Sequence, residues 1–69
     1  MKKGRIVKIL GEIPFKRLNK NSISNSISMG NFFDCEFEIY EIIDDCIVLK
    51  NIDEKIVINK KHRNKLVEV

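Results

Sequence analysis

Apolar and polar residues alternate most regularly in the middle of the chain. From Phe32 to Ile43, the apolar residues Phe33, Cys35, Phe37 and Ile39 alternate with acidic residues. A period of two is typical of a strand with one face in the core and the other in water. This segment therefore predicts a long strand that begins at Phe32.

The alternation changes phase near the end of this strand. Tyr40 and Ile42 are apolar and Glu41 between them is polar, which exchanges the two faces. A strand can change face only at a β-bulge or a sharp bend. We therefore expect a bent strand, as in small barrels whose strands pass from one sheet to another.

Four shorter apolar runs predict further strands. Glycines bound the first run. The turn Asp44–Asp45 precedes the second run, and the turn Asn51–Glu54 separates the second run from the third. The four runs are Arg5–Leu10, Cys46–Lys50, Lys55–Asn59 and Leu66–Val69. The polar segment Lys60–Asn64 is too short for a stable α-helix, so it predicts a single helical turn before the last strand.

The segment after the first strand lacks a regular pattern. Gly11–Pro14 breaks the chain after that strand, and Phe15–Leu18 could form a helical turn but is too short to assign. Asn19–Asn31 contains all four serines and four of the seven asparagines, which bond to nearby backbone groups and favour turns. We expect a long loop there, with a short helix as the alternative around Ile23 and Ile27.

This order of elements predicts an all-β fold of one domain, residues 1–69. The specific expectation is an SH3-like, small five-stranded barrel with a long first loop, in which the last strand lies beside the first. Closure would hide the edges of such a small sheet. Composition agrees, because the 69 residues include twelve Ile and five Val but no Ala, and β-branched residues favour strands.

Location and redox state follow from two further observations. No apolar run approaches the ~18 residues of a membrane helix, and the run after the basic N-terminus is too short for a signal peptide. Cys35 and Cys46 would lie ~26 Å apart on consecutive strands, which is beyond the reach of a disulfide. We expect two free thiols and a cytoplasmic protein.

Residues suited to catalysis or metal binding are few. His62 is the only histidine and lies among cations, with no Ser or Cys beside it in sequence. No C-x-x-C or closely spaced His pair is present. Asp34, Glu36 and Glu38 could hold a hard cation weakly, but the simpler interpretation is the solvated face of a strand. We predict neither enzymatic activity, nor a cofactor, nor a metal site.

Charge is divided unevenly along the chain. Residues 1–20 carry +6, residues 21–54 carry −7 and residues 55–69 carry +4. Pairing of the first and last strands would gather up to eight cations, a patch that could attract phosphates or an acidic protein. The predicted basic patch comprises Lys2, Lys3, Arg5, Lys8, Lys60, Lys61, Arg63 and Lys65. Single-strand binders usually add aromatic platforms, and the aromatic residues are not interleaved with these cations.

The long loop supplies a second group of candidate residues. Phe15 and Phe32 each lie at an end of a loop, and partial exposure and core filling are both open for them, with core filling at least as well supported. Exposed aromatic residues beside charges are a common feature of protein contacts. The predicted partner-binding residues are Phe15, Arg17, Ile23, Ile27 and Phe32.

The layout resembles the FeoA family, small SH3-like proteins of bacterial ferrous-iron uptake. Gly4–Ile9 is similar to that family's first strand, and Phe15–Leu18 resembles the start of its helix. Gly30 is similar to the glycine before its central strand. Ile56–Lys60 and Leu66–Val69 resemble its closing strand, basic turn and final strand.

The resemblance implies a non-enzymatic accessory protein without a bound cofactor. Its partner would be the cytoplasmic part of a membrane iron permease. The leading expectation is therefore a FeoA-like binding or regulatory module. The alternatives are a small nucleic-acid-binding barrel that uses the basic termini, and a phage-type protein that binds and inhibits a host factor. Pairing of two copies through an exposed strand edge also stays open.

Overall fold

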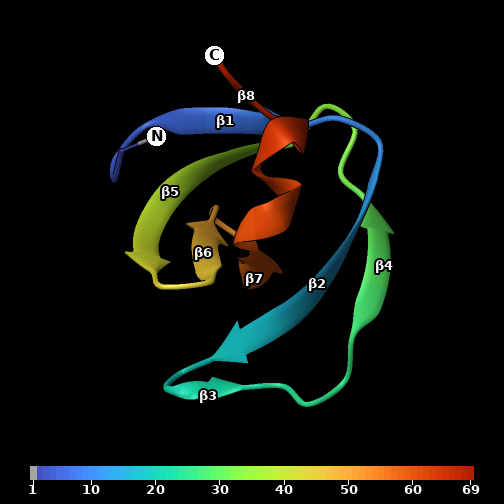
Figure 1. Cartoon of the computed structure of the whole chain (residues 1–69), viewed down its shortest axis with the longest axis vertical. Coiled ribbons are helices and arrows are strands. Elements are labelled where there is room, and N and C mark those ends of the chain that lie inside the picture. Colours follow the sequence, from blue (N-terminus) through green and yellow to red (C-terminus); the bar gives the residue numbers. More distant parts are fainter. Residues whose placement is uncertain (1) are drawn as a thin grey trace.

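Eight strands form one antiparallel sheet in this computed structural model, which describes residues 2–69 (Figure 1). The all-β prediction is confirmed. The strands are β1 (Ile6–Ile9), β2 (Glu12–Asn19), β3 (Ser22–Ile23), β4 (Ser28–Asn31), β5 (Glu36–Ile43), β6 (Cys46–Lys50), β7 (Lys55–Asn59) and β8 (Leu66–Glu68), with a 3-10 helix, η1 (Lys60–Lys65), before β8.

The sheet is strongly curled. Its order is β3-β2-β7-β6-β5-β1-β8, and β4 also pairs with β2. Only Leu10 and Gly11 connect β1 to β2, although three strands separate them in the sheet. Such a link spans at most about 11 Å, whereas a flat sheet would hold these strands about 19 Å apart. The sheet must therefore bend round until β1 and β2 approach each other (Figure 1).

The closed five-stranded barrel is not confirmed. The sheet has eight strands, and within residues 2–69 no ladder joins β1 directly to β2. The three additional strands come from the segment 12–31, where a long loop was expected.

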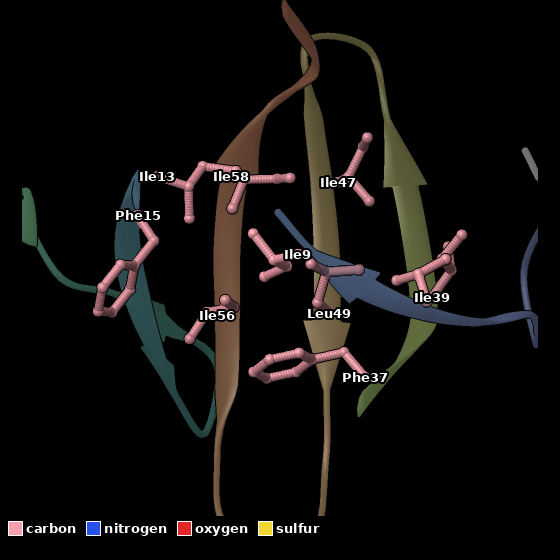
Figure 2. Packing of buried hydrophobic residues seen from close by; sticks show 10 residues of the cluster. Ile9, Ile13, Phe15, Phe37, Ile39, Ile47, Leu49, Ile56 and Ile58 are labelled. Atoms are coloured by element: carbon pink, nitrogen blue, oxygen red, sulfur yellow. The ribbon is translucent and has the colours of Figure 1, made fainter. Parts of the chain in front are cut away.

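The core lies on the inner face of the curl. Alternate residues of β1, β2, β5, β6 and β7 point into it, and each such side chain contributes about 1.5–3 kcal/mol to folding when fully buried. Figure 2 shows these side chains converging between the ribbons. The ten buried residues of this cluster are Val7, Ile9, Ile13, Phe15, Phe37, Ile39, Ile47, Leu49, Ile56 and Ile58.

The segment 12–31 differs from the expectation of at most one helical turn followed by a long loop. Phe15–Leu18 is extended, not helical, because it belongs to β2. The polar segment after it forms a hairpin: β3 pairs with the end of β2 and β4 pairs with its beginning. Pro14 fits within β2 because β7 pairs only with Lys16 and Arg17, so at the proline the side of β2 toward β7 carries no ladder and only β4 pairs with it.

The strand β5 begins later than predicted. Residues 32–35 form a turn in which Cys35 N–H donates to the Phe32 carbonyl at 2.9 Å, and Asp34 adopts a φ of +66°. Phe33 consequently points to solvent, 77% exposed, and Phe32 packs against the core instead. Asp34 therefore lies in a turn, before the strand that carries Glu36 and Glu38.

Other details of the prediction are confirmed. The register shifts between Ile39 and Glu41, which is the expected bulge. Asp44–Asp45 forms the hairpin turn, since Ile43 pairs with Cys46. The helical turn η1 is present, and the Asn59 side chain caps it by accepting from Lys61 N–H at 2.9 Å.

The first and last strands lie side by side, as predicted. Val7 pairs with Glu68, Lys8 with Val67 and Ile9 with Leu66. This ladder places β1 inside the sheet and β8 at its edge. The two basic ends of the sequence therefore share one side of the molecule.

Candidate binding surfaces

A groove opens where β2 separates from β7. The two strands pair only at Lys16–Val57 and Arg17–Ile56, and beyond this point the groove encloses about 340 Å³. The β2–β4 hairpin forms one wall, and β7 with η1 forms the other. Its lining residues are Pro14, Phe15, Lys16, Ile23, Ile27, Cys46, Val57, Ile58, Asn59, Lys61 and His62. Among the residues that the structure describes, this lining contains no carboxylate.

Two of the predicted partner-binding residues lie in this groove as exposed side chains. Ile23 and Ile27 belong to the hairpin and are 49% and 68% exposed. Pro14 and Val57 continue the apolar surface between the walls. The groove is therefore apolar along its floor and cationic at its rim, where Lys16 and Lys61 stand.

Phe15 and Phe32 were expected to be partly exposed or to fill the core, and the structure places them differently. Phe15 is buried in the core, which is the core-filling alternative, so it is not an exposed partner-binding residue. Phe32 is half-buried and makes edge-to-face contacts with Phe15 and Phe37, at centroid distances of 5.0 and 5.3 Å. Phe15 is an inward position of β2, and the turn at residues 32–35 directs Phe32 against the core beside it.

Arg17 covers one end of the core. Its guanidinium lies 5.4 Å from the Phe15 ring centroid and forms an ion pair with Glu54, in the turn between β6 and β7. The ion pair joins the β2–β4 hairpin to the opposite hairpin. This contact gives Arg17 a structural role at the side of the core.

The predicted basic patch is only partly free to bind an anion. Lys3 Nζ lies 3.2 Å from the Glu41 carboxylate, and Lys65 Nζ donates to the Glu12 carbonyl at 2.8 Å. Lys8 stands directly opposite Glu36. Lys61 belongs to the rim of the groove. The four remaining members, Lys2, Arg5, Lys60 and Arg63, are exposed or half-buried.

A second surface lies on the outer face of the sheet, opposite the core. Directly opposed residues of neighbouring antiparallel strands point to the same face, so one row contains Glu41, Val48, Val57 and Lys16. Two positions further along β6 and β7, Lys50 stands directly opposite Lys55, on the same face.

Tyr40 joins these two lysines. Lys50 Nζ lies 4.7 Å from the centroid of its ring, and Lys55 Nζ lies 4.6 Å from it. The ring is 42% exposed. We define the outer-face cluster as Tyr40, Lys50 and Lys55. Its signals in the sequence are the phase change at Tyr40 and the two lysines that flank the turn 51–54, but both neighbours of Tyr40 along β5 that face solvent are acidic, which masks the cluster.

Metal and thiol chemistry have little geometric support. Within residues 2–69, no three His, Cys, Asp or Glu side chains are grouped so that they could hold a metal ion. Cys35 and Cys46 are free and half-buried. No helix in the described part of the chain is long and apolar enough to cross a bilayer.

Comparison with known proteins adds no relative. No family model, no curated protein and no solved structure matches the chain. The two surfaces must therefore be interpreted from their own chemistry.

Proposed function

We propose that the chain is a non-catalytic binding module, and that its groove docks an extended, acidic and partly apolar segment of a partner protein. The observation that carries this proposal is the groove's combination of apolar floor and cationic rim, without a carboxylate among its described lining residues.

The apolar part of the groove supplies the affinity. Ile23 and Ile27 together form an exposed aliphatic wall beside Val57 and Pro14. Covering apolar surface contributes about 25 cal/mol per Å² before the costs of association. Contiguous exposed apolar surface rimmed by polar groups is characteristic of interaction sites.

The charged rim selects the partner. Lys16 and Lys61 stand beside the apolar floor, and His62 adds a hydrogen-bonding group. Cations at a rim accelerate the encounter with an acidic segment and disfavour a basic one. An acidic partner segment with aliphatic anchors therefore fits both properties of the groove.

The fold and the sequence resemblance suggest which partner to test first. We propose that β1, β5, β6, β7 and β8 correspond to the strands of an SH3-like barrel, because they follow one another in that order with a 3-10 helix before the last. The resemblance to the FeoA family then makes the cytoplasmic domain of a ferrous iron permease the first candidate, and the cytoplasm the proposed location. Phe15–Leu18 departs from that family because it is a strand here.

Titration of the ¹⁵N-labelled chain with the purified cytoplasmic domain of the permease tests this proposal. We expect backbone amide shifts at Ile23, Ile27 and Lys61, and a loss of affinity of at least about tenfold for Ile27→Ser, as for a truncated interface anchor. Val67→Ser removes a similarly exposed aliphatic side chain from β8 and serves as the matched control. No binding would overturn the permease as partner, and binding that Ile27→Ser leaves unchanged would overturn the groove.

A further inference from the structure

The geometry points to a second binding activity: the outer-face cluster of Tyr40, Lys50 and Lys55 binds single-stranded nucleic acid. A base stacks on the tyrosine ring, and the adjoining phosphates contact the two ammonium groups. None of these three residues lines the groove, although Lys16 and Val57 of the groove lie one row away on the same outer face.

The first argument is the opposition of two like charges. Lys50 and Lys55 form a directly opposed pair in the ladder between β6 and β7, an arrangement that disfavours folding when both are charged. The Tyr40 ring lies within 4.7 Å of both ammonium groups and offsets part of this repulsion. Proteins depart from locally stable choices mainly at functional sites. An anion bound between Lys50 and Lys55 would neutralise their repulsion, so the opposed pair favours an anionic ligand.

The second argument is how Tyr40 reaches the outer face. The register shift between Ile39 and Glu41 inserts one extra residue into β5. Ile39 and Ile42 both pack toward the core on either side of it, so Tyr40 and Glu41 can both stay outside. Bulges frequently redirect a side chain at a functional site.

The charges around the cluster leave it positive. Lys16 shares the outer face one row away, and Glu41 in that row is paired with Lys3 at 3.2 Å. Glu38 stands opposite Lys50 on the β5 side and is the acid that faces the cluster directly. Glu36 lines the same hollow as Glu38 and Lys50, and it stands opposite Lys8. With Lys3 and Lys8 included, five cations thus face three carboxylates across this surface.

The ligand class follows from the combination of ring and cations. A single strand of nucleic acid offers a flat base and a phosphate in every nucleotide, so it satisfies the ring and the ammonium groups together. An acidic peptide satisfies both groups only where an aromatic side chain lies beside its carboxylates. Stacking tolerates any base, so we expect little dependence on sequence.

The composition of the chain provides a direct reporter. Tyr40 is the only tyrosine and tryptophan is absent, so the intrinsic fluorescence comes from this ring. The full chain is titrated with oligo(dT) and oligo(U) of about 15 nucleotides, a length that covers the usual single-strand sites, and with polyphosphate of matched charge. We expect both oligonucleotides to quench the emission, after correction for their absorption, and polyphosphate to leave it nearly unchanged.

Variants separate stacking from general attraction, with affinity measured by anisotropy of fluorescein-labelled oligo(dT). Tyr40→Leu should weaken binding about five- to 150-fold, as expected for the loss of one stacked base, and Tyr40→Phe should retain it. Lys55→Gln should reduce the salt dependence by about one phosphate contact. Arg63→Gln makes the same change of charge on η1 and should leave affinity within about twofold.

Three results would overturn the inference. Equal quenching by polyphosphate would show anion binding without stacking. Unchanged affinity of Tyr40→Leu, with a folded far-UV spectrum, would remove the ring from the site. A loss for Arg63→Gln as large as that for Lys55→Gln would place binding at the basic termini. The groove variant Ile27→Ser should bind oligo(dT) normally, so this test and that of protein docking fail independently.

Discussion

Lys50 lies directly opposite Lys55 in the ladder between β6 and β7, and the turn that joins these strands holds the two lysines in register. In that turn, the Asn51 side chain accepts hydrogen bonds at 2.9 Å from the backbone N–H groups of Asp53 and Glu54. Asn51 N–H also donates to the Glu54 carbonyl at 2.9 Å. An Asn that bonds to the backbone two residues on fixes a turn, so the lysines cannot separate by a slip of register.

The first prediction concerns this pair. Lys55→Glu replaces a like-charge opposition by an opposite-charge pair with Lys50, so it removes a repulsion and adds an attraction, and we expect the free energy of unfolding to rise by about 1 kcal/mol. The same variant should lose binding of oligo(dT), which would show that the lysine serves the ligand at the expense of stability. Urea denaturation at low salt measures the first effect.

Arg63→Glu is the control for this substitution. It makes the same change in net charge at an exposed position of η1, and it should leave the unfolding free energy within about 0.5 kcal/mol. A clear loss of stability in Lys55→Glu would contradict the interpretation of the opposed lysines as an unfavourable pair.

The second prediction concerns the contact between β4 and the aromatic core. A Cβ atom at Gly30 would lie 2.6 Å from Phe15 Cε1 and about 3.0 Å from the Phe32 ring. Phe15 is buried and cannot move aside freely, so Gly30→Ala should destabilise the chain by about 1–3 kcal/mol through overpacking. Thermal unfolding followed by circular dichroism measures the loss.

Ser28→Ala provides the comparison within the same strand, because Ser28 is exposed. Its effect should stay within about 0.5 kcal/mol. Equal melting temperatures for the two variants would contradict the close packing of β4 on Phe15.

The third prediction concerns the ion pair between Arg17 and Glu54. The two side chains are 53% and 25% exposed, so a double-mutant cycle with Arg17→Ala and Glu54→Ala should give a coupling of only about 0.5 kcal/mol, which salt reduces. Arg17→Ala alone should cost more, about 1 kcal/mol, because its guanidinium also covers the Phe15 ring.

The pair of Lys3 and Glu41 allows the same cycle on a more exposed contact. Its side chains are 61% and 43% exposed, and the coupling should be near zero. A larger coupling here than between Arg17 and Glu54 would contradict the ranking by exposure.

The second half of the chain could be predicted closely from its sequence. The strands Cys46–Lys50 and Lys55–Asn59 have the predicted bounds because each is an unbroken apolar run between polar turns. The bulge after Ile39 could be predicted too, because only an inserted residue lets the inward alternation continue at Ile42.

The segment around Phe32 could not be predicted from alternation alone. Phe32 and Phe33 are adjacent, so a pattern of period two directs one of them inward, and continuity with Phe37 favours Phe33. The left-handed turn at Asp34 interrupts the strand and resets that phase. Phe32 then reaches the core, and its contact with Phe15 draws β2 and β5 together.

The β2–β4 hairpin was missed for a related reason. Its second arm consists of Ser, Asn, Gly and Met residues that face mainly solvent, so it has no apolar periodicity to detect. Gly30 lies against the Phe15 ring, which requires the absence of a side chain. The groove could not be predicted without this hairpin, although Ile23 and Ile27 were candidates, because the separation of β2 from β7 is a tertiary property.

The ladder between β1 and β8 has a consequence for the speed of folding. It joins segments almost sixty residues apart in the chain, and contacts of such long sequence separation slow the search for the native state. Refolding should consequently take milliseconds to seconds despite the small size of the protein. Until the C-terminal segment has been synthesised, one edge of β1 lacks its partner, so the nascent chain passes through an interval in which that edge is open to aggregation.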